Sequence, residues 1–244
     1  MSYAAFGITV RVGSATLLDD VSIAVGPGEI VAVAGPNGAG KTTLLGVLAG
    51  DRRPDGGAVM LDEQALADWS GAELARRRAV MGTERAVAFA FTATEVAMMG
   101  RMPLHGGDPD VTDRAVIARL LREVDCSRLA DRVFVTLSTG ERQRVQLARA
   151  IAQVTDAEPA TGAPDRYLLL DEPTSSLDPA HQHTAMRLLR RVADTGLGVI
   201  AVLHDLNLAA AYADRVVLMR QASVVESGPP ADVLRPDLLE SVFD

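Results

Sequence analysis

The chain has 244 residues, of which 48% are hydrophobic and 23% charged, so it is long enough to bury the core of one large domain. Its formal net charge of -8 at pH 7 gives no electrostatic support to a general nucleic-acid-binding role. The single cysteine excludes an internal disulfide and a multi-cysteine metal site and indicates a reduced, cytoplasmic setting. No stretch approaches the roughly 20 apolar residues that cross a bilayer.

Short apolar runs alternate with helical patterns along the chain, which predicts an α/β fold with a mostly parallel core sheet. At the N-terminus, residues 8–12 and 21–25 instead alternate between apolar and polar, as in an antiparallel ribbon. A Val- and Ile-rich strand at 29–34 is followed by a glycine-rich loop and a helical pattern at 41–49. We therefore expect the first core strand and its helix to flank that loop.

A long helical pattern stands between two of the expected core strands. It runs from 94 to 153 and is rich in Ala, Leu, Arg and Glu, whereas the apolar runs at 167–170 and 199–203 have the length of strands. We therefore predict one domain over residues 1–244, with a helical subdomain of approximately residues 85–155 inserted in the core.

Residues 35–42 read Gly-Pro-Asn-Gly-Ala-Gly-Lys-Thr and match the phosphate-binding pattern G-x-x-x-x-G-K-[ST], after a strand and at the start of a helix. Glycines allow backbone N–H groups to turn toward phosphate oxygens, and the helix N-terminus adds partial positive charge. A chance glycine-rich turn is the alternative, but the flanking strand and helix favour a nucleotide site. We expect Lys41 to reach the β- and γ-phosphates and the Thr42 hydroxyl to ligate Mg²⁺. The residues expected to contact the nucleotide here are Gly35, Pro36, Asn37, Gly38, Ala39, Gly40, Lys41, Thr42 and Thr43.

Two carboxylates follow the apolar run that ends at Leu170. Asp171 is the expected partner of Mg²⁺, directly or through water, because a hard cation prefers oxygen ligands. Glu172 is the candidate general base or water-orienting residue for attack on the γ-phosphate. Two solvated acids at a strand end are the alternative, and the phosphate-binding pattern favours the hydrolytic role.

Three further blocks resemble those of the ATP-binding cassette (ABC) ATPases. Residues 137–150 are similar to the signature motif of that family and its helix, residues 171–178 resemble its second carboxylate motif and the loop after it, and His204 stands at the place of its switch histidine. With the phosphate loop, these blocks match the family in order and spacing, and the resemblance covers essentially the whole chain. The resemblance implies an ABC nucleotide-binding domain with a P-loop NTPase (RecA-like) core, an N-terminal antiparallel β subdomain and an inserted helical subdomain.

The resemblance also implies an ATPase that uses ATP and Mg²⁺ and works as a homodimer. In that family the signature faces the γ-phosphate held by the other protomer, so Ser138 and Gly140 are expected to contact a nucleotide across the dimer. Catalysis is expected of Glu172, Lys41 and His204, and His204 is placed to stabilise charge on the γ-phosphate. Without the resemblance, Ser138 would be interpreted as an ordinary N-cap and His204 as a structural histidine.

The sequence departs from the family pattern at three places. Val12 stands where an aromatic residue usually stacks on adenine, and it can pack against the base but has no stacking face. Thr139 replaces a glycine of the signature. Thr83, followed by Glu84, stands where a glutamine normally contacts Mg²⁺ and the attacking water. We expect Thr83 or Glu84 to provide that metal contact instead, with altered coupling between hydrolysis and transport.

Several segments are similar to the ATPases of iron-chelate, haem and cobalamin importers, among them residues 74–80, 91–96 and 203–214. Residues 178–182, and an insertion containing Asp, Pro and Gly before Arg166, resemble the haem branch. The resemblance implies a peripheral subunit at the cytoplasmic face of the inner membrane, which energises haem uptake through two transmembrane permease subunits and is served indirectly by a substrate-binding protein. A siderophore or cobalamin importer is the alternative.

Two other classes of protein are less well supported. An ABC ATPase that acts on nucleic acid or the ribosome usually has two cassettes, coiled coils or basic arms, which this acidic single cassette lacks, so no nucleic-acid partner is expected. A non-hydrolysing regulatory module is supported by the altered positions Val12 and Thr83 alone. Retention of Lys41, Asp171, Glu172 and His204 argues against it.

Overall fold

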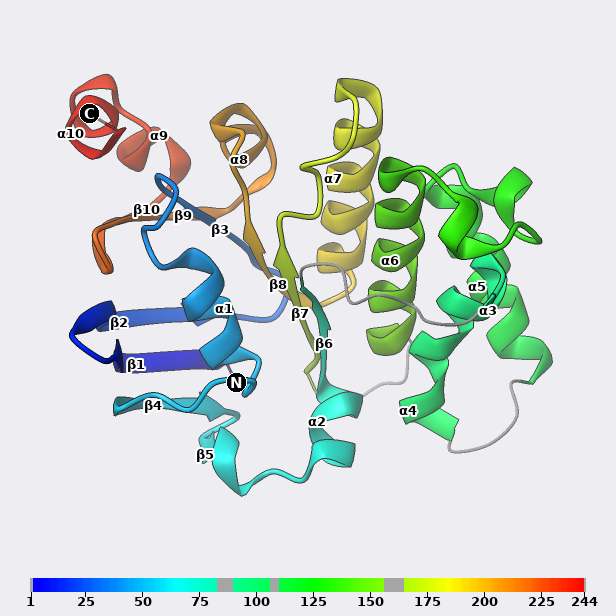
Figure 1. The fold of residues 1–244 in the computed structure, drawn as a ribbon, viewed down its shortest axis with the longest axis horizontal. Helices are drawn as coiled ribbons and strands as arrows, with labels where there is room; N and C mark the ends of the chain where they lie inside the picture. The colour runs from blue at the N-terminus through cyan, green and yellow to red at the C-terminus, as the bar shows by residue number, and fades with distance from the viewer. Residues whose placement is uncertain (1, 83–89, 106–109, 156–164, 244) are drawn as a thin grey trace.

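The computed structural model describes residues 2–82, 90–105, 110–155 and 165–243, which form two β sheets and the helices around them. The smaller sheet lies at one side, the larger sheet runs through the middle, and the helices formed by the chain between 93 and 154 lie at the other side (Figure 1). This arrangement confirms the expected α/β fold, a P-loop NTPase core with an antiparallel subdomain and a helical insertion.

The smaller sheet contains four strands in the order β2-β1-β4-β5. Buried and exposed residues alternate along much of its two longest strands, because only one face of the sheet packs on the core. The antiparallel ribbon expected near the N-terminus is confirmed, with Ile8 paired to Val21. The strands are β1 (Tyr3–Val12), β2 (Ala15–Val25), β4 (Gly56–Leu61) and β5 (Gln64–Ala65).

The larger sheet contains six strands in the order β10-β9-β3-β8-β7-β6. Neighbouring strands from β9 to β6 are parallel, and β10 is antiparallel to β9. Every residue of β3, β7 and β8 is buried, because helices and the smaller sheet cover both faces, and this explains the continuous apolar runs in the sequence. The strands are β3 (Ile30–Ala34), β6 (Arg78–Met81), β7 (Tyr167–Asp171), β8 (Gly198–Val202), β9 (Arg215–Arg220) and β10 (Ser223–Gly228).

Alternate residues of β3 belong to two separate hydrophobic cores. Ile30 and Ala32 pack with α7 (Pro179–Asp194), whereas Val31 and Val33 pack with α1 (Lys41–Leu48) and the smaller sheet. The phosphate-binding loop begins where β3 leaves these two cores, so packing on both faces positions it. The other helices of the core are η1 (Leu66–Asp68), α2 (Gly71–Arg77), α8 (Leu206–Tyr212), α9 (Pro230–Val233) and α10 (Pro236–Phe243).

The described residues between β6 and β7 form the helical insertion, although the two strands are neighbours in the sheet. The sequence predicts a helical pattern from 94 to 153. The chain between the two long helices, from residue 124 to 138, forms turns and short 3-10 helices instead. Asp125 has a φ of 54°, a left-handed conformation typical of a residue that follows a helix end. The elements are α3 (Ala93–Met98), η2 (Met99–Arg101), α4 (Met102–His105), α5 (Val111–Glu123), η3 (Ser127–Leu129), η4 (Phe134–Thr136) and α6 (Thr139–Val154).

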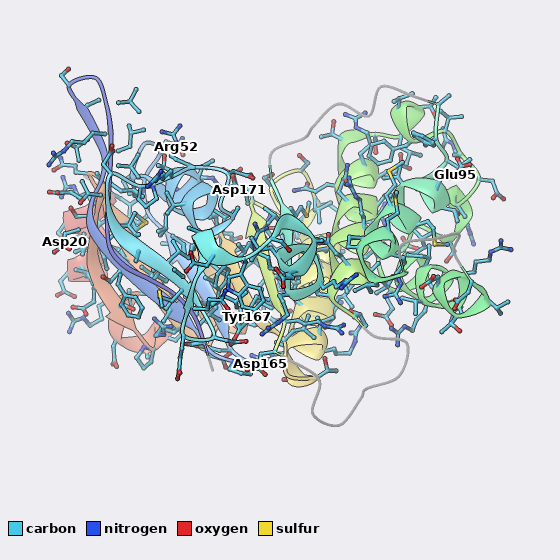
Figure 2. All side chains as sticks on the ribbon, turned by 90° about the horizontal axis from the view of Figure 1, so that it is seen from below. Asp20, Arg52, Glu95, Asp165, Tyr167 and Asp171 are labelled. Carbon is cyan, nitrogen blue, oxygen red and sulfur yellow. The ribbon has the colours of Figure 1, made fainter. Side chains whose placement is uncertain are left out.

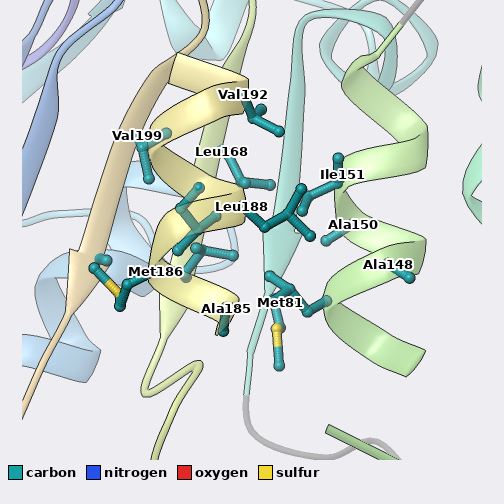
Figure 3. Packing of buried hydrophobic residues seen from close by; sticks show 14 of the residues in the cluster. Met81, Ala148, Ala150, Ile151, Leu168, Ala185, Met186, Leu188, Val192 and Val199 are labelled. Atoms are coloured by element: carbon teal, nitrogen blue, oxygen red, sulfur yellow. The ribbon is translucent and has the colours of Figure 1, made fainter. Parts of the chain in front are cut away.

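Helix α6 attaches this insertion to the core. Apolar side chains of α6 such as Ile151 gather with Leu168 of β7 and Leu188 of α7 in one hydrophobic cluster (Figure 3). The side chain of Gln153 donates to the backbone carbonyl oxygens of Ala75 and Arg78 at 2.8 and 3.0 Å. Apolar packing and polar contacts therefore both hold α6 against the core of the larger sheet.

Candidate functional site

The phosphate-binding loop joins β3 to α1 and approaches other backbone so closely that two positions require glycine. Gly35 has a φ of 146°, and a Cβ atom there would lie 2.1 Å from the carbonyl oxygen of Met219 on β9. Gly40 has a φ of 103°, and a Cβ atom there would lie 2.7 Å from the carbonyl oxygen of Leu17 on β2. Since both neighbours are backbone atoms of strands, the two sheets hold the loop in a bent conformation.

Lys41 is the first residue of α1 and points back into the loop. Its Nζ donates to the carbonyl oxygens of Gly35 and Pro36 at 2.8 and 2.9 Å. The residue is only 6% exposed. Burial lowers the pKa of its amine, and the nearby charges of Glu172 and Asp171 raise that pKa in part. A cation is thus held beneath the loop, within electrostatic reach of two carboxylates.

Asp171 ends β7 and faces Thr42, the second residue of α1. The Thr42 hydroxyl donates to Oδ1 of Asp171 at 3.4 Å. Burial raises the pKa of the Asp171 carboxyl, and the hydrogen bond from Thr42 lowers that pKa in part. Figure 2 shows Asp171 near the middle of the molecule, between the sheets and the helical insertion that carries Glu95. Thr42 and Asp171 together present adjacent oxygen atoms of the kind that a hard divalent cation prefers.

Glu172 and His204 contact each other beside this pair. His204 Nε2 lies 2.6 Å from Oε1 of Glu172. Glu172 follows β7 and His204 closely follows the neighbouring strand β8, so the sheet order brings together two residues that are distant in the sequence. The side chain of His204 is 43% exposed and that of Glu172 is 38% exposed. This pair is therefore open to solvent, whereas Asp171 is buried.

Five predicted site residues thus converge at the carboxyl ends of β3, β7 and β8: Lys41, Thr42, Asp171, Glu172 and His204. The carboxyl ends of parallel strands are where ligands bind in open α/β sheets. A buried cation, a hydroxyl–carboxylate pair and an exposed carboxylate–imidazole pair can together bind a polyphosphate and activate a water molecule.

The segment that resembles the ABC signature begins α6. The Ser138 hydroxyl accepts a hydrogen bond from the backbone N–H of Glu141 at 3.3 Å, and the Ser138 N–H donates to Oε2 of Glu141 at 2.7 Å. These reciprocal bonds form a capping box and lower the pKa of the Glu141 carboxyl. Ser138 is therefore the N-cap of α6 in this structure, and its contact with a second protomer's nucleotide stays a prediction.

The remaining candidates are placed differently. Val12 ends β1 with its side chain exposed, and its contact with the base stays a prediction. Gly140 is half-buried against the loop after β7, because a Cβ atom there would lie 2.7 Å from the carbonyl oxygen of Ser176. Thr83 and Glu84 lie outside the described residues, so their metal contact stays a prediction.

One contact at this site was missed by the sequence predictions. Gln143, in the second turn of α6, donates to the backbone carbonyl oxygen of Glu172 at 2.6 Å. The sequence holds a weak signal for this contact. Gln143 is three residues after Gly140, so both lie on the same face of α6 and can meet the same neighbouring loop. The same face of α6 lines a cavity of about 480 Å³, together with α2, β6 and the loop after β7.

Comparison with known proteins identifies the family. Residues 18–175 match the family model described as ABC transporter. The chain belongs to the ABC transporter family. This cassette is 48% identical over 237 residues to the hemin import ATP-binding protein HmuV of Rhodococcus jostii, covering 97% of this chain and 78% of that protein. It is 47% identical over 239 residues to the HmuV protein of Gloeobacter violaceus, covering 98% of this chain and 86% of that protein.

Solved ABC cassettes share the fold. The ATP-binding subunit of an ABC transporter superimposes with a TM-score of 0.82 at 24% identity, covering 99% of this chain and 98% of that one. A dimeric bacterial ABC transporter cassette superimposes with a TM-score of 0.79 at 25% identity, covering 94% of this chain and 99% of that one. Membership in this family identifies the chain as a nucleotide-binding ATPase. Within the described ranges, this ABC cassette has no helix with the length and hydropathy needed to cross a membrane.

Proposed function

We propose that this ABC cassette is the ATP-hydrolysing subunit of an importer that takes up haem or a related iron chelate. The convergence of Lys41, Asp171 and the Glu172–His204 pair supports the hydrolytic role. The hemin import proteins that are 48% and 47% identical to this chain support the cargo.

The proposed assembly has two copies of the cassette beneath a membrane permease. The chain acts as one nucleotide-binding domain over residues 1–244, with approximately residues 85–155 as its helical subdomain. It is peripheral at the cytoplasmic face of the inner membrane, where it docks onto two permease subunits and serves a substrate-binding protein indirectly. The dimeric cassette at 25% identity supports the homodimer.

In the proposed nucleotide site, Gly35 to Thr43 surround the phosphates of ATP. The N–H groups of the loop and the N-terminus of α1 supply positive potential. Lys41 exchanges its two carbonyl partners for oxygens of the β- and γ-phosphates. The phosphates stabilise its ammonium, whose charge burial disfavours in the free protein. Val12 borders the base with aliphatic surface.

Mg²⁺ fits beside these phosphates because Thr42 and Asp171 offer two oxygen atoms 3.4 Å apart. Burial disfavours the charged form of the Asp171 carboxylate, and a divalent cation bound there would stabilise that form. Thr42 and Asp171 would hold the ion, Asp171 directly or through water, and Thr83 or Glu84 would add a further oxygen. When bound, the ion neutralises phosphate charge.

Glu172 is proposed as the general base or water-orienting residue. Its carboxylate accepts the proton of the attacking water as the water oxygen bonds to the γ-phosphorus and the bond to the β,γ-bridging oxygen breaks, which leaves ADP and phosphate. His204 contacts the γ-phosphate and stabilises the charge that develops there. Contact between the two side chains at 2.6 Å keeps both beside the loop before nucleotide binds.

The start of α6 completes the site of the other protomer. Ser138 offers its hydroxyl and Gly140 its N–H at the positive end of a helix of 16 residues. In the dimer both face the γ-phosphate held by the partner's loop. An isolated monomer therefore lacks part of each site and hydrolyses ATP slowly.

The test is haem-stimulated hydrolysis by the reconstituted complex. We expect phosphate release to rise when a haem-loaded binding protein is added to the cassette and its permease. Glu172→Gln should lower that rate by at least about 100-fold, because the amide cannot accept a proton. The variant should still bind ATP and accumulate as an ATP-bound dimer in gel filtration. Wild-type turnover in Glu172→Gln would refute the role of Glu172, and stimulation by cobalamin-loaded but not haem-loaded binding protein would refute the cargo.

A second prediction concerns the base. Val12→Tyr should lower the KM for ATP by about fivefold with little change in kcat, because an aromatic ring gains about 1 kcal/mol by stacking on a base. Val111, which is 83% exposed at the start of α5, provides the matched control for adding a surface tyrosine. If the KM for ATP is the same as that of the wild type in both Val12→Tyr and Val111→Tyr, Val12 does not border the base.

A further inference from the structure

Gln143 of α6 binds the loop that follows β7 at three residues. Its Nε2 donates to the carbonyl oxygen of Glu172 at 2.6 Å and to the hydroxyl oxygen of Ser175 at 3.3 Å. Its Oε1 accepts from the backbone N–H of Ser176 at 2.9 Å. Both ends of one amide side chain are therefore used on one loop.

The first residue of this loop has an unfavourable backbone conformation. Glu172 has a φ of 50°, in the left-handed region that residues with side chains rarely adopt. Its carbonyl oxygen also accepts hydrogen bonds from the N–H and hydroxyl of Ser175 at 3.3 and 3.2 Å, in addition to the bond from Gln143. In this conformation the Glu172 carboxylate reaches His204. Such a backbone persists only where its surroundings hold it, and Gln143 is part of those surroundings.

Helix α6 touches the same loop at a second point. A Cβ atom on Gly140 would lie 2.7 Å from the carbonyl oxygen of Ser176, so the loop backbone rests directly on the helix. Gly140 and Gln143 share one face of α6. The separation between the start of α6 and the backbone of Glu172 is therefore set by direct contacts within one chain.

We propose that Gln143 is a positioning residue for ATP hydrolysis, which holds the backbone of Glu172 so that its carboxylate faces the attacking water. The proposal rests on the hydrolytic role proposed above for Glu172. Gln143 acts through the loop, since its amide bonds to the loop at both ends. It also links two half-sites, because the helix that presents Ser138 and Gly140 to the partner's nucleotide positions the carboxylate that acts on the chain's own nucleotide.

Two substitutions remove the contact in different ways. Gln143→Glu keeps the shape and the acceptor for Ser176, but it places a carboxylate oxygen against the carbonyl oxygen of Glu172. Gln143→Met keeps the length and has no donor. Both should lower kcat by about 10- to 100-fold, as expected of a misplaced catalytic group. The KM and the equilibrium affinity for ATP should change by less than about twofold, because the phosphate-binding loop is unaltered.

The matched control is Gln146, one turn further along α6. It accepts a hydrogen bond from Arg149 of the same helix at 3.3 Å. Gln146→Met should leave kcat, KM and thermal stability close to those of the wild type. An equal loss of kcat in Gln146→Met and Gln143→Met would mean that any change on this face of α6 lowers turnover, and it would overturn the proposal.

A double-mutant cycle tests whether Gln143 acts through Glu172. Residual single-turnover hydrolysis by Glu172→Gln should not fall further when Gln143→Met is added, because the group that Gln143 positions is already lost. A further loss equal to that of Gln143→Met alone would refute the proposal. Normal kcat in both Gln143 variants, beside an inactive Glu172→Gln, would overturn this proposal alone. Wild-type turnover in Glu172→Gln would overturn the role of Glu172 and this proposal with it.

Discussion

Replacing Lys41 by methionine is expected to lower ATP hydrolysis by about 100- to 1,000-fold, the usual effect of removing one charge-stabilising donor from a reaction site. The same change should leave the fold about as stable as before. Methionine keeps the length of the side chain and removes a charge that burial disfavours, although the carbonyl oxygens of Gly35 and Pro36 lose a donor. We expect the Tm of the nucleotide-free variant at neutral pH to stay within about 4 °C of the wild type.

The lowered pKa of Lys41 determines how the stability of the wild type changes with pH relative to Lys41→Met. Because burial lowers the pKa of Lys41 in the folded chain, the folded protein binds fewer protons than the unfolded chain between the two pKa values. Wild-type stability therefore gains from this group as pH rises through that range, and the penalty is fully present below it. Lys41→Met lacks this term. As pH rises toward the ordinary pKa range of lysine, the unfolding free energy of the wild type should therefore increase relative to that of Lys41→Met.

The sequence offers an unusually direct measurement of this side chain, because Lys41 is the only lysine among the 244 residues. An amine-selective reagent can therefore label only Lys41 and the N-terminal amine, and peptide mass spectrometry separates the two. ATP should protect Lys41 and leave labelling of the N-terminus unchanged. Lys41→Arg is the control for charge alone, and it should also be inactive because a guanidinium is larger and planar. Equal labelling with and without ATP would contradict the proposed phosphate contact.

The nucleotide site is predictable from sequence because its signals are local. Strand, glycine-rich loop and helix follow one another within residues 30–48, and Asp171 and Glu172 come at the end of an uninterrupted apolar run. Parallel strands then bring the two segments together at the same edge of the sheet, as the structure shows for Lys41 and Asp171.

Contacts between distant segments are not predictable in the same way. Gln143 looks like one more polar residue on a helix, and Arg101 looks like one more surface charge, until packing places each beside a partner. The prediction of a continuous helical pattern fails before α6 for a similar reason. The chain there forms turns, which contacts between distant segments such as the Thr92–Val133 bridge hold in place. Secondary-structure propensity is a property of a single segment, whereas these contacts and turns depend on how distant segments pack together.

A buried ion pair joins elements of the helical insertion. Arg101 Nε donates to Oδ1 of Asp113 at 2.7 Å, and the two side chains are only 4% and 2% exposed. The same guanidinium donates through Nη1 to the carbonyl oxygens of Ala152 and Thr155 at 2.8 and 2.5 Å. Arg101 therefore joins the segment after α3, helix α5 and the end of α6, the helix that also carries the signature.

Asp113→Ala is accordingly expected to destabilise the protein by about 3–5 kcal/mol, because a buried guanidinium loses its counter-charge. Denaturant unfolding at neutral pH measures the change. Glu123, on the same helix, is the control: it pairs with Arg191, whose side chain is 57% exposed, and Glu123→Ala should cost no more than about 1 kcal/mol. Replacing both partners, as Arg101→Met with Asp113→Leu, should recover much of the loss, since apolar residues can substitute for a buried pair. A loss below about 1 kcal/mol in Asp113→Ala would show that the stability of the protein does not depend on the Arg101–Asp113 ion pair.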